Sequence, residues 1–170
     1  MHKLLTLTLL CTLSFSNPLH LPSEKNYSTL KQTQIDSATL SYLIEEKKLL
    51  RDMYVVFSEL FEEKLWVEMR QKEEKNLAFL EEVFSNEALL IPSTLSIVGY
   101  FENELLQENY DSLVLQGSST PEEALDVCMM MKEIEIEYLK YHTQAHDAIS
   151  LQFLKESQED LTLLKNAYVQ

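Results

Sequence analysis

The sequence is poor in the residues that interrupt helices. Its 170 residues include two glycines and four prolines. A β-sandwich needs turns at short intervals, and turns depend on these two residue types, so the composition argues against an all-β fold. A phosphate-binding loop built on several glycines is excluded for the same reason. Leu, Glu, Lys and Met are abundant instead, which favours a domain made mainly of helices.

Basic residues are also scarce. Fourteen Lys and Arg are set against twenty-eight Asp and Glu, which gives a formal net charge of -14. A surface this acidic repels the phosphates of nucleic acids, and no basic patch with interleaved aromatic residues offsets the repulsion. We therefore expect no nucleic-acid partner.

The first sixteen residues, MHKLLTLTLLCTLSFS, are typical of a secretory signal peptide. Lys3 supplies the positive start, residues 4–15 form an apolar stretch too short for a stable membrane anchor, and Ser14 and Ser16 are small residues at the expected cleavage site. We predict an exported protein, periplasmic or secreted, with no stable membrane span after cleavage. A lipoprotein attached through Cys11 is the alternative, although the large Leu10 before it is unfavourable.

Cysteine cannot hold the exported protein together. Removal of residues 1–16 would leave Cys128 as the only cysteine, and one cysteine cannot form an internal disulfide. The fold must therefore depend on packing.

The remaining chain divides into a short linker and one helical domain. Residues 17–34 are polar, contain two prolines and have no helical period, whereas 35–170 carry the periodic segments. Apolar residues recur at three- and four-residue steps in four long segments, at about 36–63, 64–86, 121–141 and 145–167. Four amphipathic helices of similar length predict an all-α, ferritin-like four-helix bundle.

A crossover loop and a short extra helix are expected between helices 2 and 3. Residues 88–101 lose the helical period and include Pro92 and Gly99, and a short helix follows at about 102–115 before Gly117. Thr120 and Glu123 then have the spacing of a capping box, which predicts the start of the third long helix.

Each long helix places polar residues on or beside its apolar face. These residues are Glu46, Glu73, Asn76, Glu133, Glu135 and Asp160, with Glu133 and Glu135 as alternatives on the third helix. Buried carboxylates are costly unless they are protonated, paired with Lys or Arg, or bound to a cation. Carboxylates that point inward from four helices hold two iron or manganese ions in ferritin-like bundles. The competing interpretation is that these residues lie at the edge of the core and reach water.

Several segments resemble an uncharacterised ferritin-like family, domain of unknown function 2202. EEKKLLRDMY at 45–54 resembles its EEEKLARDVY signature, and FENELLQENYDSLVLQGSSTPEEAL at 101–125 is similar to its FxNxxLQxLYxxLxxxG segment and the SxxEAL that follows. KEIEIEYL at 132–139 resembles EELDIxDL, and KESQEDL at 155–161 resembles RGSRNHL. The resemblance covers about residues 40–164 and implies a ferritin-like fold.

The sequence departs from the family pattern at the positions that the resemblance would assign to metal. Glu73 matches the pattern, but Asn76 and Asp160 stand where the family has histidine, and Lys132 replaces a glutamate. Asparagine is a weaker ligand than imidazole for iron, which puts a complete di-iron site in doubt.

Two hypotheses follow. In the first, Glu46, Glu73, Asn76, Glu133 or Glu135, and Asp160 bind iron or manganese, and the protein handles oxidants. In the second, which we favour, the chain binds no cofactor and is a non-enzymatic structural or interaction bundle whose metal site has degenerated. A homo-oligomer or a protein partner in the cell envelope is compatible with either hypothesis.

Overall fold

The computed structural model describes residues 37–142 and 148–168, and this part of the chain is entirely helical. The helices are α1 (Ser37–Leu60), α2 (Lys64–Asn86), α3 (Glu104–Gly117), α4 (Pro121–His142) and α5 (Ala148–Tyr168), and no strand occurs in the described residues. The prediction of an all-α fold is confirmed. The predicted signal peptide, the linker and the expected beginning of the last helix at 145–147 lie outside the described residues.

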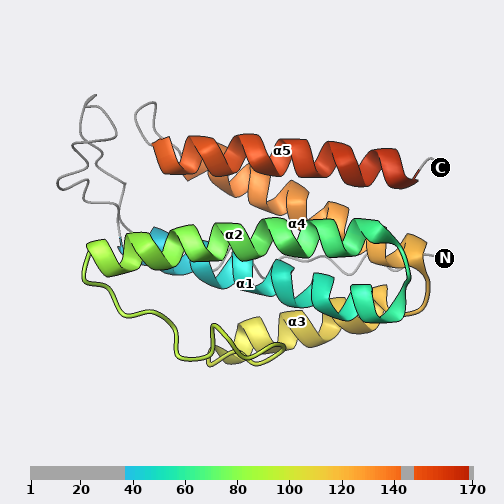
Figure 1. The fold of residues 1–170 in the computed structure, drawn as a ribbon, viewed down its shortest axis with the longest axis horizontal. Coiled ribbons are helices and arrows are strands. Elements are labelled where there is room, and N and C mark those ends of the chain that lie inside the picture. Colours follow the sequence, from blue (N-terminus) through green and yellow to red (C-terminus); the bar gives the residue numbers. More distant parts are fainter. Residues whose placement is uncertain (1–36, 143–147, 169–170) are drawn as a thin grey trace.

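The helices form two antiparallel pairs with α3 beside them (Figure 1). Residues 61–63 join α1 to α2, and these two helices pack against each other. Helices α4 and α5 pack against each other as the second pair. Helices α1 and α4 also contact each other, and both contact α3, so these two helices connect the pairs. Within residues 37–142 and 148–168, no helix is long and apolar enough to cross a membrane.

Side chains before α3 and α4 fix the beginnings of these helices. The Asn103 side chain accepts hydrogen bonds from the backbone N–H groups of Leu105 and Leu106, at 3.0 and 3.3 Å. The Glu123 N–H donates to Thr120 Oγ1 at 3.2 Å, as the capping-box pattern predicted. Each cap satisfies N–H groups that have no partner within the helix.

Gly117 is the last residue of α3, but its role differs from that of a usual glycine stop. The backbone adopts a positive φ at Gly99 and not at Gly117, so the left-handed conformation of a helix-ending glycine is absent there. A Cβ at Gly117 would lie 2.5 Å from Cζ of Phe57. The glycine therefore allows α3 to approach α1 closely.

The interior consists of two apolar clusters with a polar layer between them. One cluster lies toward the α1–α2 turn and includes Met53, Phe57, Trp66, Met69, Val127 and Leu164. The other lies toward the beginning of α1 and includes Leu40, Leu43, Leu77, Phe84, Leu139 and Phe153. On all four long helices, buried charged residues occupy the positions between the two clusters.

Candidate functional site

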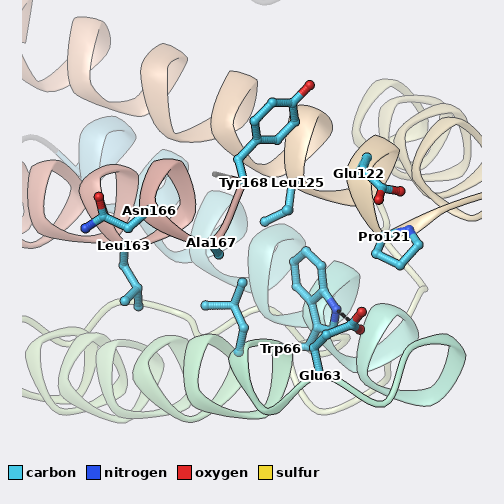
Figure 2. Close-up of a pocket in the computed structure, with 10 residues that line it drawn as sticks. Glu63, Trp66, Pro121, Glu122, Leu125, Leu163, Asn166, Ala167 and Tyr168 are labelled. Carbon is cyan, nitrogen blue, oxygen red and sulfur yellow. Dashed lines mark hydrogen bonds between the residues drawn. The ribbon is translucent and has the colours of Figure 1, made fainter. Parts of the chain in front are cut away.

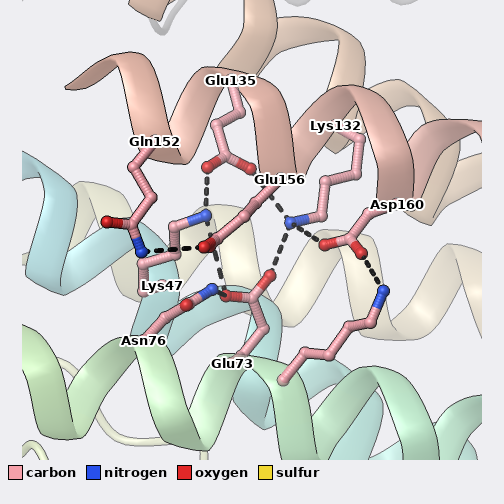
Figure 3. Close-up of polar contacts among 9 residues, drawn as sticks. Lys47, Glu73, Asn76, Lys132, Glu135, Gln152, Glu156 and Asp160 are labelled. Atoms are coloured by element: carbon pink, nitrogen blue, oxygen red, sulfur yellow. Dashed lines mark hydrogen bonds and ion pairs between the residues drawn. The ribbon is translucent and has the colours of Figure 1, made fainter. Parts of the chain in front are cut away.

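The polar layer gathers charged side chains from α1, α2, α4 and α5 (Figure 3). The buried members are Glu46 and Lys47 of α1, Glu73 of α2, Lys132 and Glu135 of α4, and Asp160 of α5. Each lies one or two turns from a core residue of its own helix, so the helical period that buries the apolar residues also turns these charges inward.

Lys132 is the centre of the layer. Its Nζ lies 2.5 Å from Glu73 Oε1, 3.1 Å from Glu135 Oε2 and 3.3 Å from Asp160 Oδ2. One ammonium group therefore joins carboxylates from three helices. An ammonium has three N–H donors, so this arrangement can use its full donor capacity.

Lys47 provides the second ammonium group of the layer. It forms an ion pair with Glu135, and its Nζ lies 3.7 Å from Glu73 Oε2. Asn76 Nδ2 donates to the same Glu73 oxygen at 3.0 Å. At the outer edge, Lys72 Nζ contacts Asp160 Oδ1 at 2.6 Å. Glu73, Glu135 and Asp160 are thus each bound by cationic side chains.

The ion pairs set the protonation states at the centre. Burial alone would raise the pKa of Glu135, but Lys132 and Lys47 lower it to about 2. Burial would lower the pKa of Lys132, but Glu135 and Glu73 raise it well above its ordinary value. At neutral pH these groups are therefore ionised, which is the state that strengthens their mutual attraction.

Glu46 differs from the other carboxyl groups of the layer. Neither of its carboxyl oxygens has a hydrogen-bond partner of ordinary geometry among the described residues. Burial and then repulsion by Glu135 raise its pKa well above the ordinary value of 4.5. These surroundings favour the protonated form of Glu46. The other three carboxylates, Glu73, Glu135 and Asp160, face the ammonium groups of Lys47, Lys132 and Lys72.

The structure places the predicted site residues in two locations. Glu73, Asn76, Glu135 and Asp160 come together in the layer (Figure 3), and the charges of Glu135 and Lys47 act on the buried Glu46. Glu133 lies on the exposed face of α4, where its Oε1 is 3.1 Å from Lys165 Nζ. Of the two alternatives on this helix, Glu135 is the inward one.

Sequence reasoning placed Lys132 at a motif position but missed its role as an ion-pair partner, and it missed Lys47 altogether. Lys47 is four residues after Leu43 and three before Leu50, and Lys132 is four residues after Cys128 and four before Ile136. That helical spacing was the available signal, because a lysine on an apolar face needs a buried carboxylate as its partner.

No group of three or more His, Cys, Asp or Glu in residues 37–142 and 148–168 has an arrangement suited to holding a metal ion. The carboxylates of the layer converge, but they converge on ammonium groups. Lys132 and Lys47 both contact Glu73 and Glu135, so a cation could bind these carboxylates only by displacing a lysine.

A second cluster of buried charge lies on the opposite face of α1. Asp52 accepts hydrogen bonds from Lys48 Nζ at 2.5 Å and from the Gly99 N–H at 2.9 Å, and it also forms an ion pair with Arg51. Lys48 Nζ donates to the Ile97 carbonyl at 2.9 Å. These residues come from the EEKKLLRDMY signature and hold the loop between α2 and α3 against α1.

Further contacts of this loop involve α3 and an aromatic ring. Gln107 accepts a hydrogen bond from the Phe101 N–H at 2.9 Å and donates to the Gly99 carbonyl at 3.0 Å. Lys48 Nζ lies 3.9 Å from the centre of the Phe101 ring, within the range of a cation–π contact. The loop is thus fixed from α1 and from α3.

A cavity of about 420 Å³ lies where α2 and α4 begin and α5 ends (Figure 2). Leu125, Leu163 and Trp66 form part of its wall, and Trp66 Nε1 donates to Glu63 Oε2 at 3.2 Å. The lining contains no basic side chain and no cysteine.

Cys128 is buried elsewhere in the core, where burial raises the pKa of its thiol and suppresses the reactive thiolate.

Comparisons with known proteins identify a family without assigning an activity. The family model described as "Uncharacterized protein domain (DUF2202)" matches residues 36–158, and the chain belongs to this family. None of the curated proteins matches the chain. Among solved structures, the chain is similar to hypothetical protein MJ0754 from Methanococcus jannaschii DSM 2661, with a TM-score of 0.74, 19% identity, and coverage of 88% of this chain and 85% of that one. This likeness shows a shared fold alone.

Proposed function

We propose that this DUF2202 protein is an exported, ferritin-like four-helix bundle that acts as a non-enzymatic binding or structural module of the cell envelope. Four long helices with a crossover connection between α2 and α4 support the bundle assignment. Export is proposed from residues 1–16.

The observation that carries the proposal is the position of the Lys132 ammonium group. It lies between Glu73, Glu135 and Asp160, where inward carboxylates of a ferritin-like bundle would hold a cation. Together with Lys47 and Lys72, Lys132 supplies three positive charges against these three carboxylates, which makes an added cation unnecessary. The ion pairs of Lys132 connect α2, α4 and α5, and those of Lys47 add α1.

The donor set does not fit a resident pair of iron or manganese ions. Glu73 and Glu135 contact both lysines, so binding a metal through them would leave buried ammonium groups without partners. Uncompensated buried charge is strongly unfavourable. The surroundings of Glu46 raise its pKa and favour its protonated form, and a protonated carboxyl is a poor ligand.

Elemental analysis tests the absence of a metal centre. Protein purified from a host supplied with iron and manganese is expected to contain either metal well below one equivalent per chain. An Asp160→Asn variant serves as the matched control, because it removes a carboxylate but keeps a side chain of similar shape. Stoichiometric metal in the wild type that is lost in Asp160→Asn would contradict the proposal.

Export has a separate test. Cell fractionation is expected to place the protein in the envelope or the medium, and sequencing of the mature N-terminus is expected to begin at residue 17. A cytosolic protein that retains Met1 would contradict this part of the proposal and leave the assignment of the bundle unaffected.

A further inference from the structure

The loop between α2 and α3 gathers exposed apolar side chains. Half of the large apolar residues that are exposed in the described part of the chain belong to it, namely Leu90, Ile91, Ile97, Val98 and Tyr100. Leu90 is 94% exposed, and Ile97, Val98 and Tyr100 are 50%, 45% and 54% exposed. Single exposed apolar residues are ordinary, but several in one short segment mark a contact surface.

The backbone of this loop is fixed while its apolar side chains remain exposed. Arg51 donates to the Leu95 carbonyl at 2.6 Å, and Lys48 and Asp52 bind the Ile97 carbonyl and the Gly99 N–H. Asp52 is buried, so water competes little for these contacts. A surface that is ordered before binding loses less conformational entropy when a partner docks.

The charges around the loop have one sign. Between Lys75 and Lys132 the sequence contains no Lys, Arg or His, and the exposed residues Glu87, Glu102 and Glu104 flank the loop. Lys48 and Arg51 approach from α1, but both are paired with Asp52. Lys48, Arg51 and Asp52 together leave one positive charge, which is fewer than the three exposed glutamates, so the surroundings of the apolar residues remain acidic.

We propose that loop 88–101 is a docking surface for a protein segment that carries apolar side chains beside Lys or Arg residues. The apolar side chains would cover Ile97, Val98 and Tyr100, and the basic ones would meet the flanking glutamates, which orients the partner and speeds association. The proposal deepens the proposed function, since it names the surface and the partner of a binding module. A second copy of the chain and an anionic membrane both present negative charge, so the same glutamates would repel them.

The test measures fluorescence anisotropy of a labelled amphipathic peptide made of leucine and lysine, titrated with the full chain. A leucine and glutamate peptide of the same pattern is the charge control. The basic peptide is expected to bind at least about tenfold more tightly than the acidic one, and its affinity is expected to fall as salt is added.

Two variants separate the docking surface from general charge attraction. The triple substitution Ile97→Ser, Val98→Ser and Tyr100→Ser is expected to weaken binding of the basic peptide at least about tenfold. The matched control, Tyr141→Ser with Leu151→Ser, removes exposed apolar side chains from α4 and α5 and is expected to bind like the wild type. Unchanged thermal melting of both variants shows that the fold is intact.

Three results would overturn the proposal. Equal binding by the triple variant and the wild type would mean that net charge alone attracts the peptide. Sedimentation showing self-association that the triple variant abolishes would assign the surface to a second copy. Flotation with phosphatidylglycerol vesicles that the triple variant abolishes would assign it to a membrane. Stoichiometric metal in the wild type is a different readout, and it would contradict the proposed function whatever the peptide does.

Discussion

Lys47 and Lys48 are neighbours on α1, yet they belong to two different clusters of buried charge. Lys47 points into the layer between the four long helices, where it meets Glu73 and Glu135. Lys48 points the other way and binds Asp52 and the Ile97 carbonyl. The first cluster joins helices to one another, whereas the second joins a loop to a helix. Consecutive residues on a helix point in different directions, so one short signature serves both.

The two clusters also differ in what their charges replace. In the inner layer, ammonium groups neutralise carboxylates that could otherwise bind a cation. In the loop cluster, Asp52 and Lys48 satisfy backbone groups of an irregular segment, which an apolar helix surface could not do. We expect loss of an inner charge to affect global stability and loss of a loop charge to affect mainly the loop.

The largest effect is expected from Lys132→Met. The substitution keeps an unbranched side chain, one heavy atom shorter, but leaves Glu73, Glu135 and Asp160 without their shared ammonium group. Breaking a buried charge pair of this kind costs about 3–5 kcal/mol in the free energy of unfolding. Urea unfolding followed by circular dichroism measures the change.

Lys140→Met is the matched control for Lys132→Met. Lys140 lies on the same helix, but its ion pair with Glu137 is exposed. Exposed pairs contribute at most about 1 kcal/mol, so a small change is expected. Comparable losses in the two variants would mean that the inner layer has no special role.

A smaller effect is expected from Asp52→Asn. The amide keeps an oxygen for the Gly99 N–H, but it no longer neutralises Lys48 and Arg51. Hydrogen bonds to charged groups contribute about 1.5–3 kcal/mol, and we expect a loss near the lower end because Arg51 is partly exposed. Hydrogen exchange should accelerate at Gly99 more than at core amides of α2. Uniform acceleration in both segments would contradict the separation between loop and bundle.

Glu46→Gln is expected to change stability in a way that depends on pH. The folded-state pKa of Glu46 is raised, so above 4.5 the unfolded chain releases a proton that the folded chain keeps. Stability of the wild type is therefore lost as pH rises from 4.5 toward the folded pKa. Glutamine removes this loss, and the variant should gain about 1.4 kcal/mol over the wild type for the first pH unit above that value.

Comparing Glu46→Gln with the wild type at a series of pH values isolates this effect. The difference should vanish below the ordinary pKa of 4.5, where both states of the wild type hold the proton. Glu135 behaves in the opposite sense, since its folded pKa of about 2 adds stability that is lost only as pH falls below 4.5. A difference between Glu46→Gln and wild type that is independent of pH would show that Glu46 is not protonated in the folded state.

The smallest effect is expected from Glu133→Gln. Glu133 pairs with Lys165 at the surface, where solvent screens the charges, so the free energy of unfolding should change by less than about 1 kcal/mol. Glu135→Gln, which removes charge from the inner layer two residues away, should cost several times more. Thermal melting of the two variants measures the contrast, and similar losses would place both carboxylates in equivalent surroundings.

The helices and their capping residues could be predicted because they depend on local sequence. Thr120 and Glu123 mark the start of α4 through contacts between near neighbours, and the apolar period at 64–86 predicted the helix that the structure places at α2. The inward orientation of Glu73 and Asp160 followed from the same period. The period did not separate Glu133 from Glu135, because the rotation of α4 depends on how it packs against its neighbours.

The sequence by itself determined that the chain is helical, acidic and polar at one level of each long helix, because helical period and charge are properties of the chain. Only the tertiary structure decided that the polar residues at this level form ion pairs with one another. Glu73 and Lys132 are far apart in sequence, and their pairing depends on how α2 and α4 are rotated and placed. The same packing turned Lys48 and Asp52 toward a loop that the sequence marked only as irregular.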